Sequence, residues 1–102
     1  MGNFVKVATV DQMEPDRGLM VETGGQRIAL FKAGDNYYAI GDTCTHRGGP
    51  LSDGFLAGEE VTCPWHGARF DMKTGNVLSP PAPTGVPSFP VRVVGQDIEV
   101  EI

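Results

Sequence analysis

The residues best suited to chemistry lie in two short segments of the chain. Cys44 and His46 belong to the first, C-T-H-R-G-G, and Cys63 and His66 belong to the second, C-P-W-H-G-A-R-F-D. These four residues are all the cysteines and histidines of the protein. Thiolate and imidazole are ligands for zinc and for iron. The pattern therefore predicts a metal centre built from one cysteine and one histidine of each segment.

The spacing of the four residues leaves two kinds of metal centre open. Two thiolates and two imidazoles can hold a tetrahedral zinc ion, and the C-x-x-H pair of Cys63 and His66 has a usual zinc spacing. The C-x-H pair of Cys44 and His46 is tight, because neighbours two apart in an extended loop point the same way. A binuclear cluster removes this difficulty, since the cysteines can hold one iron and the histidines the other. Spacing alone favours the cluster over zinc by a small margin.

The elements that must position these ligands are β-strands joined by tight turns. The chain has 14 glycines and 8 prolines in 102 residues, which favours turns over long helices. Apolar residues follow a period of two rather than 3.6. Gly24-Gly25 and Gly95-Gln96-Asp97 each lie between two such runs and predict hairpins. The expected strands are 3–10, 19–23, 27–33, 37–40, 59–62, 70–71, 76–78, 90–94 and 98–102, with a third small hairpin around 73–75 and a proline-rich loop at 80–87.

Length and charge restrict the organisation and the partners of the protein. A chain of 102 residues is expected to form a single domain, 1–102, with the ligand segments in an insert of approximately 42–80. The net charge is −5, from 8 basic and 13 acidic side chains. Nucleic acid is excluded as an expected partner because no basic stripe is present to displace counterions from phosphates. An acidic surface suits docking to basic patches on protein partners, although solubility is the preferred explanation of the net charge taken alone.

The expected location is the cytoplasm. The first ten residues, MGNFVKVATV, have neither the basic stretch nor the continuous apolar run of a signal peptide. No segment approaches the roughly eighteen consecutive apolar residues that a membrane helix needs, so no membrane partner is expected. In a reducing compartment two cysteines are better explained as metal ligands than as a disulfide.

The two ligand segments closely resemble the Rieske iron–sulfur motif, C-x-H…C-x-x-H, and the resemblance extends to the strands and the proline-rich segment around them. It implies an all-β fold, in which an antiparallel β-sandwich scaffold carries a small cluster-binding subdomain of two loops. It also implies one [2Fe–2S] cluster held by Cys44, His46, Cys63 and His66, because in Rieske centres two histidines replace two cysteines on one iron.

Residues beside the ligands have structural and functional interpretations. Gly48, Gly49 and Gly67 can let the backbone pass close to a cluster and turn its N–H groups toward sulfur, although ordinary tight turns explain each of them equally well. Trp65 is expected to shield the site and pack on the Pro80–Pro83 loop, with docking as the alternative. We interpret Asp42 and Asp71 as loop-stabilising, Met13 and Met72 as packing, and Arg47 as solvated.

The histidine count separates a carrier from a catalyst. A Rieske terminal oxygenase needs a second, mononuclear iron held by two histidines and a carboxylate. This chain has two histidines, and the cluster would use both. A respiratory Rieske subunit would bring a membrane anchor or export signal and two extra cysteines. The chain is therefore expected to be no enzyme, and is similar to the ferredoxin of a multicomponent aromatic-ring-hydroxylating dioxygenase, such as those acting on biphenyl, naphthalene, toluene or carbazole.

This resemblance implies the partners of the protein. A ferredoxin of this kind carries single electrons from an NAD(P)H-dependent flavin reductase to a terminal Rieske non-haem iron oxygenase. It is expected to be a monomer that docks transiently near His46 and His66. Two alternatives stay open: a carrier for another monooxygenase or hydroxylase, and a zinc-stabilised binding module without a redox role.

The resemblance also predicts a low reduction potential. High-potential Rieske proteins have disulfide-forming cysteines where this chain has Gly49 and Trp65, and hydroxyl donors where it has Ala68 and Phe70. Fewer donors stabilise the reduced form less, so we expect a midpoint near the low end of the family's range, about −150 mV. Spectroelectrochemical titration of the purified protein measures this value. A midpoint well above zero would contradict the prediction.

Overall fold

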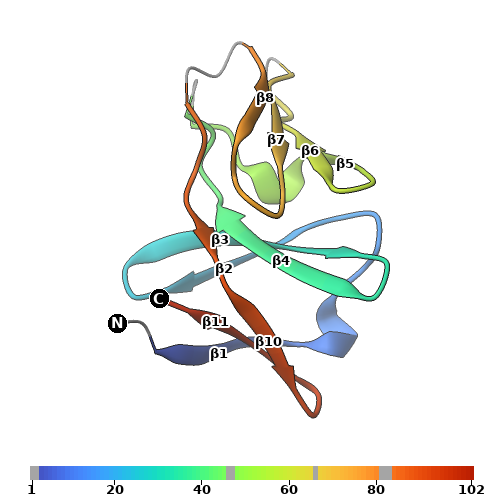
Figure 1. Cartoon of the computed structure of the whole chain (residues 1–102), viewed down its shortest axis with the longest axis vertical. Helices are drawn as coiled ribbons and strands as arrows, with labels where there is room; N and C mark the ends of the chain where they lie inside the picture. The colour runs from blue at the N-terminus through green and yellow to red at the C-terminus, as the bar shows by residue number, and fades with distance from the viewer. Residues whose placement is uncertain (1–2, 46–47, 66, 81–83) are drawn as a thin grey trace.

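The computed structural model describes residues 3–45, 48–65, 67–80 and 84–102 (Figure 1). Within these ranges the chain forms three antiparallel sheets stacked along its long axis. The lower sheet has the order β1 (Phe4–Thr9), β11 (Asp97–Glu101), β10 (Val91–Val94). The middle sheet has the order β2 (Leu19–Thr23), β3 (Gln26–Ala33), β4 (Asn36–Gly41), β9 (Ser88–Phe89). The upper sheet has the order β5 (Phe55–Ala57), β6 (Glu60–Thr62), β7 (Arg69–Asp71), β8 (Val77–Ser79).

Strand β3 is buried on both faces and forms the centre of the stack. Its run Ile28, Ala29, Leu30 and Phe31 is at most 1% exposed. Successive side chains of a strand point to opposite faces, so Ile28 and Leu30 face one layer while Ala29 and Phe31 face the other. A continuous apolar run, rather than an alternating one, is what a strand with two buried faces requires.

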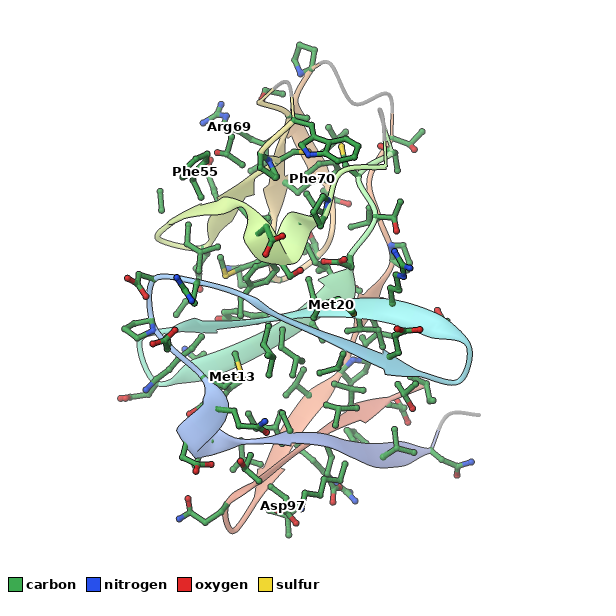
Figure 2. All side chains as sticks on the ribbon, turned by 180° about the vertical axis from the view of Figure 1, so that it is seen from behind. Met13, Met20, Phe55, Arg69, Phe70 and Asp97 are labelled. Carbon is green, nitrogen blue, oxygen red and sulfur yellow. The ribbon has the colours of Figure 1, made fainter. Side chains whose placement is uncertain are left out.

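Two hydrophobic cores follow from this arrangement, one on each side of the middle sheet. Figure 2 shows Met13 between the lower and middle sheets and Phe70 inside the upper part of the molecule. The lower core contains Ala8, Met13, Ile28, Leu30, Ala39, Ile98 and Val100. The upper core contains Ala29, Phe31, Ile40, Cys44, Leu51, Val61, Cys63, Ala68, Phe70, Met72 and Val86. Both cysteines therefore belong to the upper core.

The structure confirms the predicted all-β class and the three predicted hairpins. Strands β2 and β3, β7 and β8, and β10 and β11 pair as expected. Gly24 and Gly25 have φ values of 59° and 76°, which a two-residue hairpin turn of the primed type requires. The predicted period of two also holds in the C-terminal strand, because Ile98 and Val100 are fully buried whereas Glu99 and Glu101 between and after them are not. The extent of the single domain, 1–102, and of its insert, 42–80, stays a prediction.

Two strands were missed by the sequence analysis. Residues Phe55–Ala57 are not among the expected strands, but they form β5 and pair with β6. Ser88–Phe89 form β9 and pair with Ala39 and Ile40 of β4. Both are very short, so neither contains enough residues for a period of two to be recognised. Among the described residues, no helix is long and apolar enough to cross a membrane.

The proline-rich segment predicted to be a loop contacts three other segments: the chain at Thr45, the turn between β7 and β8, and the end of β4. Its described residues 84–87 run from the upper sheet to the middle sheet. Gly75 has a φ of 77°, and a Cβ there would lie 2.0 Å from the Val86 carbonyl oxygen, so the contact requires glycine. Three hydrogen bonds fix the segment: Thr45 Oγ1–H to Thr84 O (2.6 Å), Val86 N–H to Gly75 O (2.8 Å) and Gly41 N–H to Pro87 O (2.8 Å).

Glu59 links the middle sheet to the upper sheet. Its carboxylate accepts a hydrogen bond from the Tyr38 hydroxyl of β4 (2.9 Å) and lies 3.0 Å from Lys73 Nζ in the turn between β7 and β8. The hydrogen bond to the negatively charged carboxylate raises the pKa of Tyr38. Lys73, and then Tyr38, hold the pKa of Glu59 below its ordinary value.

We predict that Glu59→Gln lowers the pKa of Tyr38 toward its ordinary value. The neutral amide no longer opposes the phenolate charge, so the proton leaves more easily. The ¹³Cζ shift of labelled tyrosine, followed against pH in a Tyr37→Phe background, reports Tyr38 alone. Glu60→Gln is the matched control, since Glu60 pairs with Arg69 (3.1 Å). The same titration in both variants would contradict the assignment.

Candidate metal centre

The two cysteines begin two loops that close in the same way. The Cys44 N–H donates to the Gly49 carbonyl (2.9 Å), and the Cys63 N–H donates to the Ala68 carbonyl (2.7 Å). One position outside each closing bond, Thr43 pairs with Pro50 and Thr62 pairs with Arg69. We call residues 44–49 the first ligand loop and residues 63–68 the second ligand loop. Each is closed by an antiparallel pair, so the two cysteines occupy equivalent positions.

The equivalence of the loops extends through their turns and into the core. Gly48 and Gly67, each four residues after its cysteine, both have a φ of 77°, a conformation that favours glycine. Leu51 and Phe70, each seven residues after its cysteine, are both fully buried. This repeat is not among the patterns predicted from the sequence. Its signal is a cysteine, a glycine four residues later and a large apolar residue seven residues later, occurring twice.

The two thiols lie together in an apolar environment. Cys44 is 1% and Cys63 is 2% exposed, and neither is in a disulfide. Burial raises the pKa of the Cys63 thiol; the Trp65 backbone N–H opposes this rise, and the adjoining Cys44 thiol adds to it. Two thiolates this close and this buried would be costly without a positive partner. A metal group that binds both sulfurs supplies that positive charge.

Part of the predicted ligand set lies outside the described residues. The structure brings Cys44 and Cys63 together as the sequence predicts, whereas His46 and His66, like Arg47, fall in the gaps of the described ranges. Among the described side chains, no group of three or more histidine, cysteine, aspartate or glutamate residues could hold a metal ion. The histidine ligands stay a prediction.

Gly49 brings the first loop against the sulfur of the second. A Cβ at this position would lie 2.8 Å from Cys63 Sγ and 3.1 Å from Trp65 Cγ. The backbone of the first loop therefore runs beside the thiol of the second loop. The two loops are close enough for one metal group to be held between them. Trp65 contacts Gly49 on one side and keeps 49% of its surface exposed. Its predicted packing on Pro80–Pro83 falls mostly outside the described residues.

Several residues outside the ligand set have the structural roles that the sequence predicts. Asp42 Oδ1 accepts the Ser52 N–H (2.8 Å), and Asp71 Oδ1 accepts the Lys73 N–H (2.7 Å), so each aspartate stabilises a loop. Met72 is fully buried and Met13 is 7% exposed, which confirms both as packing residues. Ala68 and Phe70 are also fully buried and bring no hydroxyl to the site.

Comparison with known proteins identifies the same chemistry. Residues 3–90 match the model of the Rieske [2Fe-2S] domain. The biphenyl dioxygenase ferredoxin subunit of Pseudomonas sp. (strain KKS102) is 35% identical, over 96% of this chain and 91% of that protein. The ferredoxin of carbazole 1,9a-dioxygenase from Nocardioides aromaticivorans IC177 superposes with a TM-score of 0.90 at 34% identity, covering 96% of both chains. A ferredoxin in a complex of reduced oxygenase and oxidized ferredoxin in carbazole 1,9a-dioxygenase superposes with a TM-score of 0.87 at 35% identity, covering 95% of this chain and 91% of that one.

We predict that Gly49→Ala impairs metal binding. The added methyl group would overlap Cys63 Sγ, and relieving such overpacking costs about 1–3 kcal/mol and displaces the thiol. Iron content per protein measures the effect. Gly58→Ala is the control, because nothing lies within 4 Å of its Cβ position, so the added methyl group there meets no thiol and adds only the backbone strain of a positive φ (61°), which Gly49 does not have. Equal iron content in the two variants would contradict the prediction.

Proposed function

The chain belongs to the Rieske [2Fe–2S] domain family, and on this premise we propose that it carries single electrons from an NAD(P)H-dependent flavin reductase to a terminal Rieske non-haem iron oxygenase. Its cofactor is one Rieske-type [2Fe–2S] cluster, which supplies one-electron transfer when bound. The proposal is carried by a structural match along nearly the whole chain. The superposition covers 95% of this chain and 91% of the ferredoxin found in a complex with a reduced oxygenase.

The proposed ligands are Cys44 and Cys63 on one iron and His46 and His66 on the other. The cysteine assignment is supported by two buried thiols that adjoin each other at equivalent positions of two loops. The histidine assignment is supported by the match of C-x-H and C-x-x-H to the Rieske motif, together with the absence of further histidines from the sequence. The same count supports a carrier without a catalytic iron of its own, as in the relatives named as ferredoxin subunits.

The burial of both cysteines bears on where electrons can be exchanged with a partner. The upper core encloses both thiols, so a partner protein cannot contact the sulfurs directly. We propose that partners dock near His46 and His66, where the path for an electron is shortest. The carrier must leave one partner before it meets the next, so we propose that these interfaces are small and transient. The carrier itself is proposed to be a monomer.

The charge of the chain supports recognition of basic partner surfaces. A net charge of −5 steers the carrier toward positive patches and makes association sensitive to salt. The cytoplasm is the proposed location, since its reducing conditions keep the thiols available as ligands. A carrier role for a different monooxygenase or hydroxylase is the second candidate. The match to the Rieske model weighs against a zinc-stabilised module.

We predict that the purified protein is red-brown and gives a reducible EPR signal after dithionite treatment. Cys63→Ser and His66→Ala each remove a proposed ligand and are expected to lose the colour and the signal. Thr45→Ser is the matched control, because it lies between two proposed ligands and keeps a hydroxyl for Thr84 O. Reconstitution with NADH, a flavin reductase and a terminal oxygenase then tests electron delivery. A colourless protein that contains zinc would overturn the proposal of an iron–sulfur cluster. A coloured protein that cannot deliver electrons to any terminal oxygenase would overturn the proposal that an oxygenase is its electron acceptor.

A further inference from the structure

Asp42 is an unusual residue in the interior of this protein. Among the residues that the structure describes, the buried polar or charged side chains are Asp42, 3% exposed, and Ser52, 5% exposed. Asp42 is thus the one carboxylate that this part of the chain buries. Burying a charged group costs free energy unless partners compensate. Such a residue calls for an explanation beyond solubility.

Three hydrogen bonds hold Asp42 in place beside the first ligand loop. Its Oδ1 accepts the Ser52 N–H (2.8 Å), its carbonyl oxygen accepts the Leu51 N–H (2.7 Å), and its own N–H donates to the Arg27 carbonyl (3.1 Å). The carboxylate is therefore held by the Ser52 N–H of the short 3-10 segment η2 (Leu51–Asp53), while the Asp42 backbone is held by Arg27 of β3 and by Leu51 of η2. It lies two residues before Cys44, which is itself buried.

The second ligand loop shows that loop closure does not need this charge. The equivalent of Asp42, two residues before Cys63, is Val61, which is fully buried and apolar. Val61 pairs with Phe70 as Asp42 pairs through its carbonyl with Leu51, and the loop closes with the same Cys N–H bond. The backbone therefore performs the closure in both loops. A buried carboxylate two residues before the cysteine therefore accompanies the first ligand loop and not the second.

We propose that the buried Asp42 carboxylate, next to the first ligand loop, places a negative charge that lowers the reduction potential of the cluster this loop would hold. The inference rests on the ligand set proposed above. Reduction adds one negative charge to the centre, and a nearby carboxylate opposes that addition by Coulomb repulsion. A buried charge acts through a medium that salt screens weakly, whereas an exposed charge acts through water. This effect is separate from the lack of hydroxyl donors at Ala68 and Phe70, and it has the same sign.

The test compares two substitutions that each remove one negative charge. Asp42→Asn keeps an Oδ1 that can accept the Ser52 N–H, and Asp53→Asn removes the charge of an exposed aspartate at the end of η2. Midpoint potentials of the loaded proteins are measured by spectroelectrochemistry with dithionite and mediator dyes, at about 0.05 M and about 1 M salt. We expect Asp42→Asn to raise the potential at both salt concentrations. We expect Asp53→Asn to give a smaller rise that disappears at high salt.

The outcomes separate this inference from the proposed function. A potential for Asp42→Asn that equals that of the wild type, or a shift no larger than that of Asp53→Asn, would overturn the role of Asp42. Asp42→Ser provides a second neutral variant if the first holds too little cluster, and loss of the cluster from both would overturn the inference by making Asp42 purely structural. A wild-type protein without a reducible cluster would instead refute the proposed function.

Discussion

The contact between two buried thiols is the constraint on which the rest of the structure depends. Cys44 and Cys63 come from different loops, and each must reach the same apolar interior. Backbone groups near them cannot rely on water, so each cysteine N–H is satisfied by a carbonyl of its own loop. A positive-φ glycine reverses the chain in each loop, and the absence of a side chain at Gly49 lets the two loops meet. The loops are similar because each must bury a cysteine while keeping its backbone N–H hydrogen-bonded.

The middle sheet gives this site a rigid base without being part of it. One face of β3 closes the lower core, while the other face closes the upper core that holds the cysteines. One face of β3 thus packs in the lower core, and the opposite face packs in the core that holds the cysteines. The upper part is also fastened to the middle sheet by the Tyr38–Glu59–Lys73 contacts and by residues 84–87. These contacts join the turn at Glu59 and the turn between β7 and β8 to the middle sheet.

Electrostatics at the site differ from electrostatics at the surface. Most of the charge behind the net −5 is exposed, where it is screened and serves association with partners. Within the described residues the buried negative charge of Asp42 is the exception, and it lies beside the first ligand loop. Ala68 and Phe70 fill the neighbouring core without offering a hydroxyl. Packing and charge at the site therefore act together, because apolar neighbours and a carboxylate both disfavour an added electron.

The amino-acid sequence by itself determined the all-β class, the three hairpins and the cofactor. Gly24-Gly25, the alternation ending at Ile102 and the C-x-H…C-x-x-H pattern are local signals, readable over a few residues. Only the tertiary structure showed that Asp42 is buried while Asp53 is exposed, that Gly49 lies against Cys63, and that β5 and β9 are strands. These features depend on contacts between residues distant in the chain. Burial and register are decided by the partner that a segment meets, and a local pattern does not contain that partner.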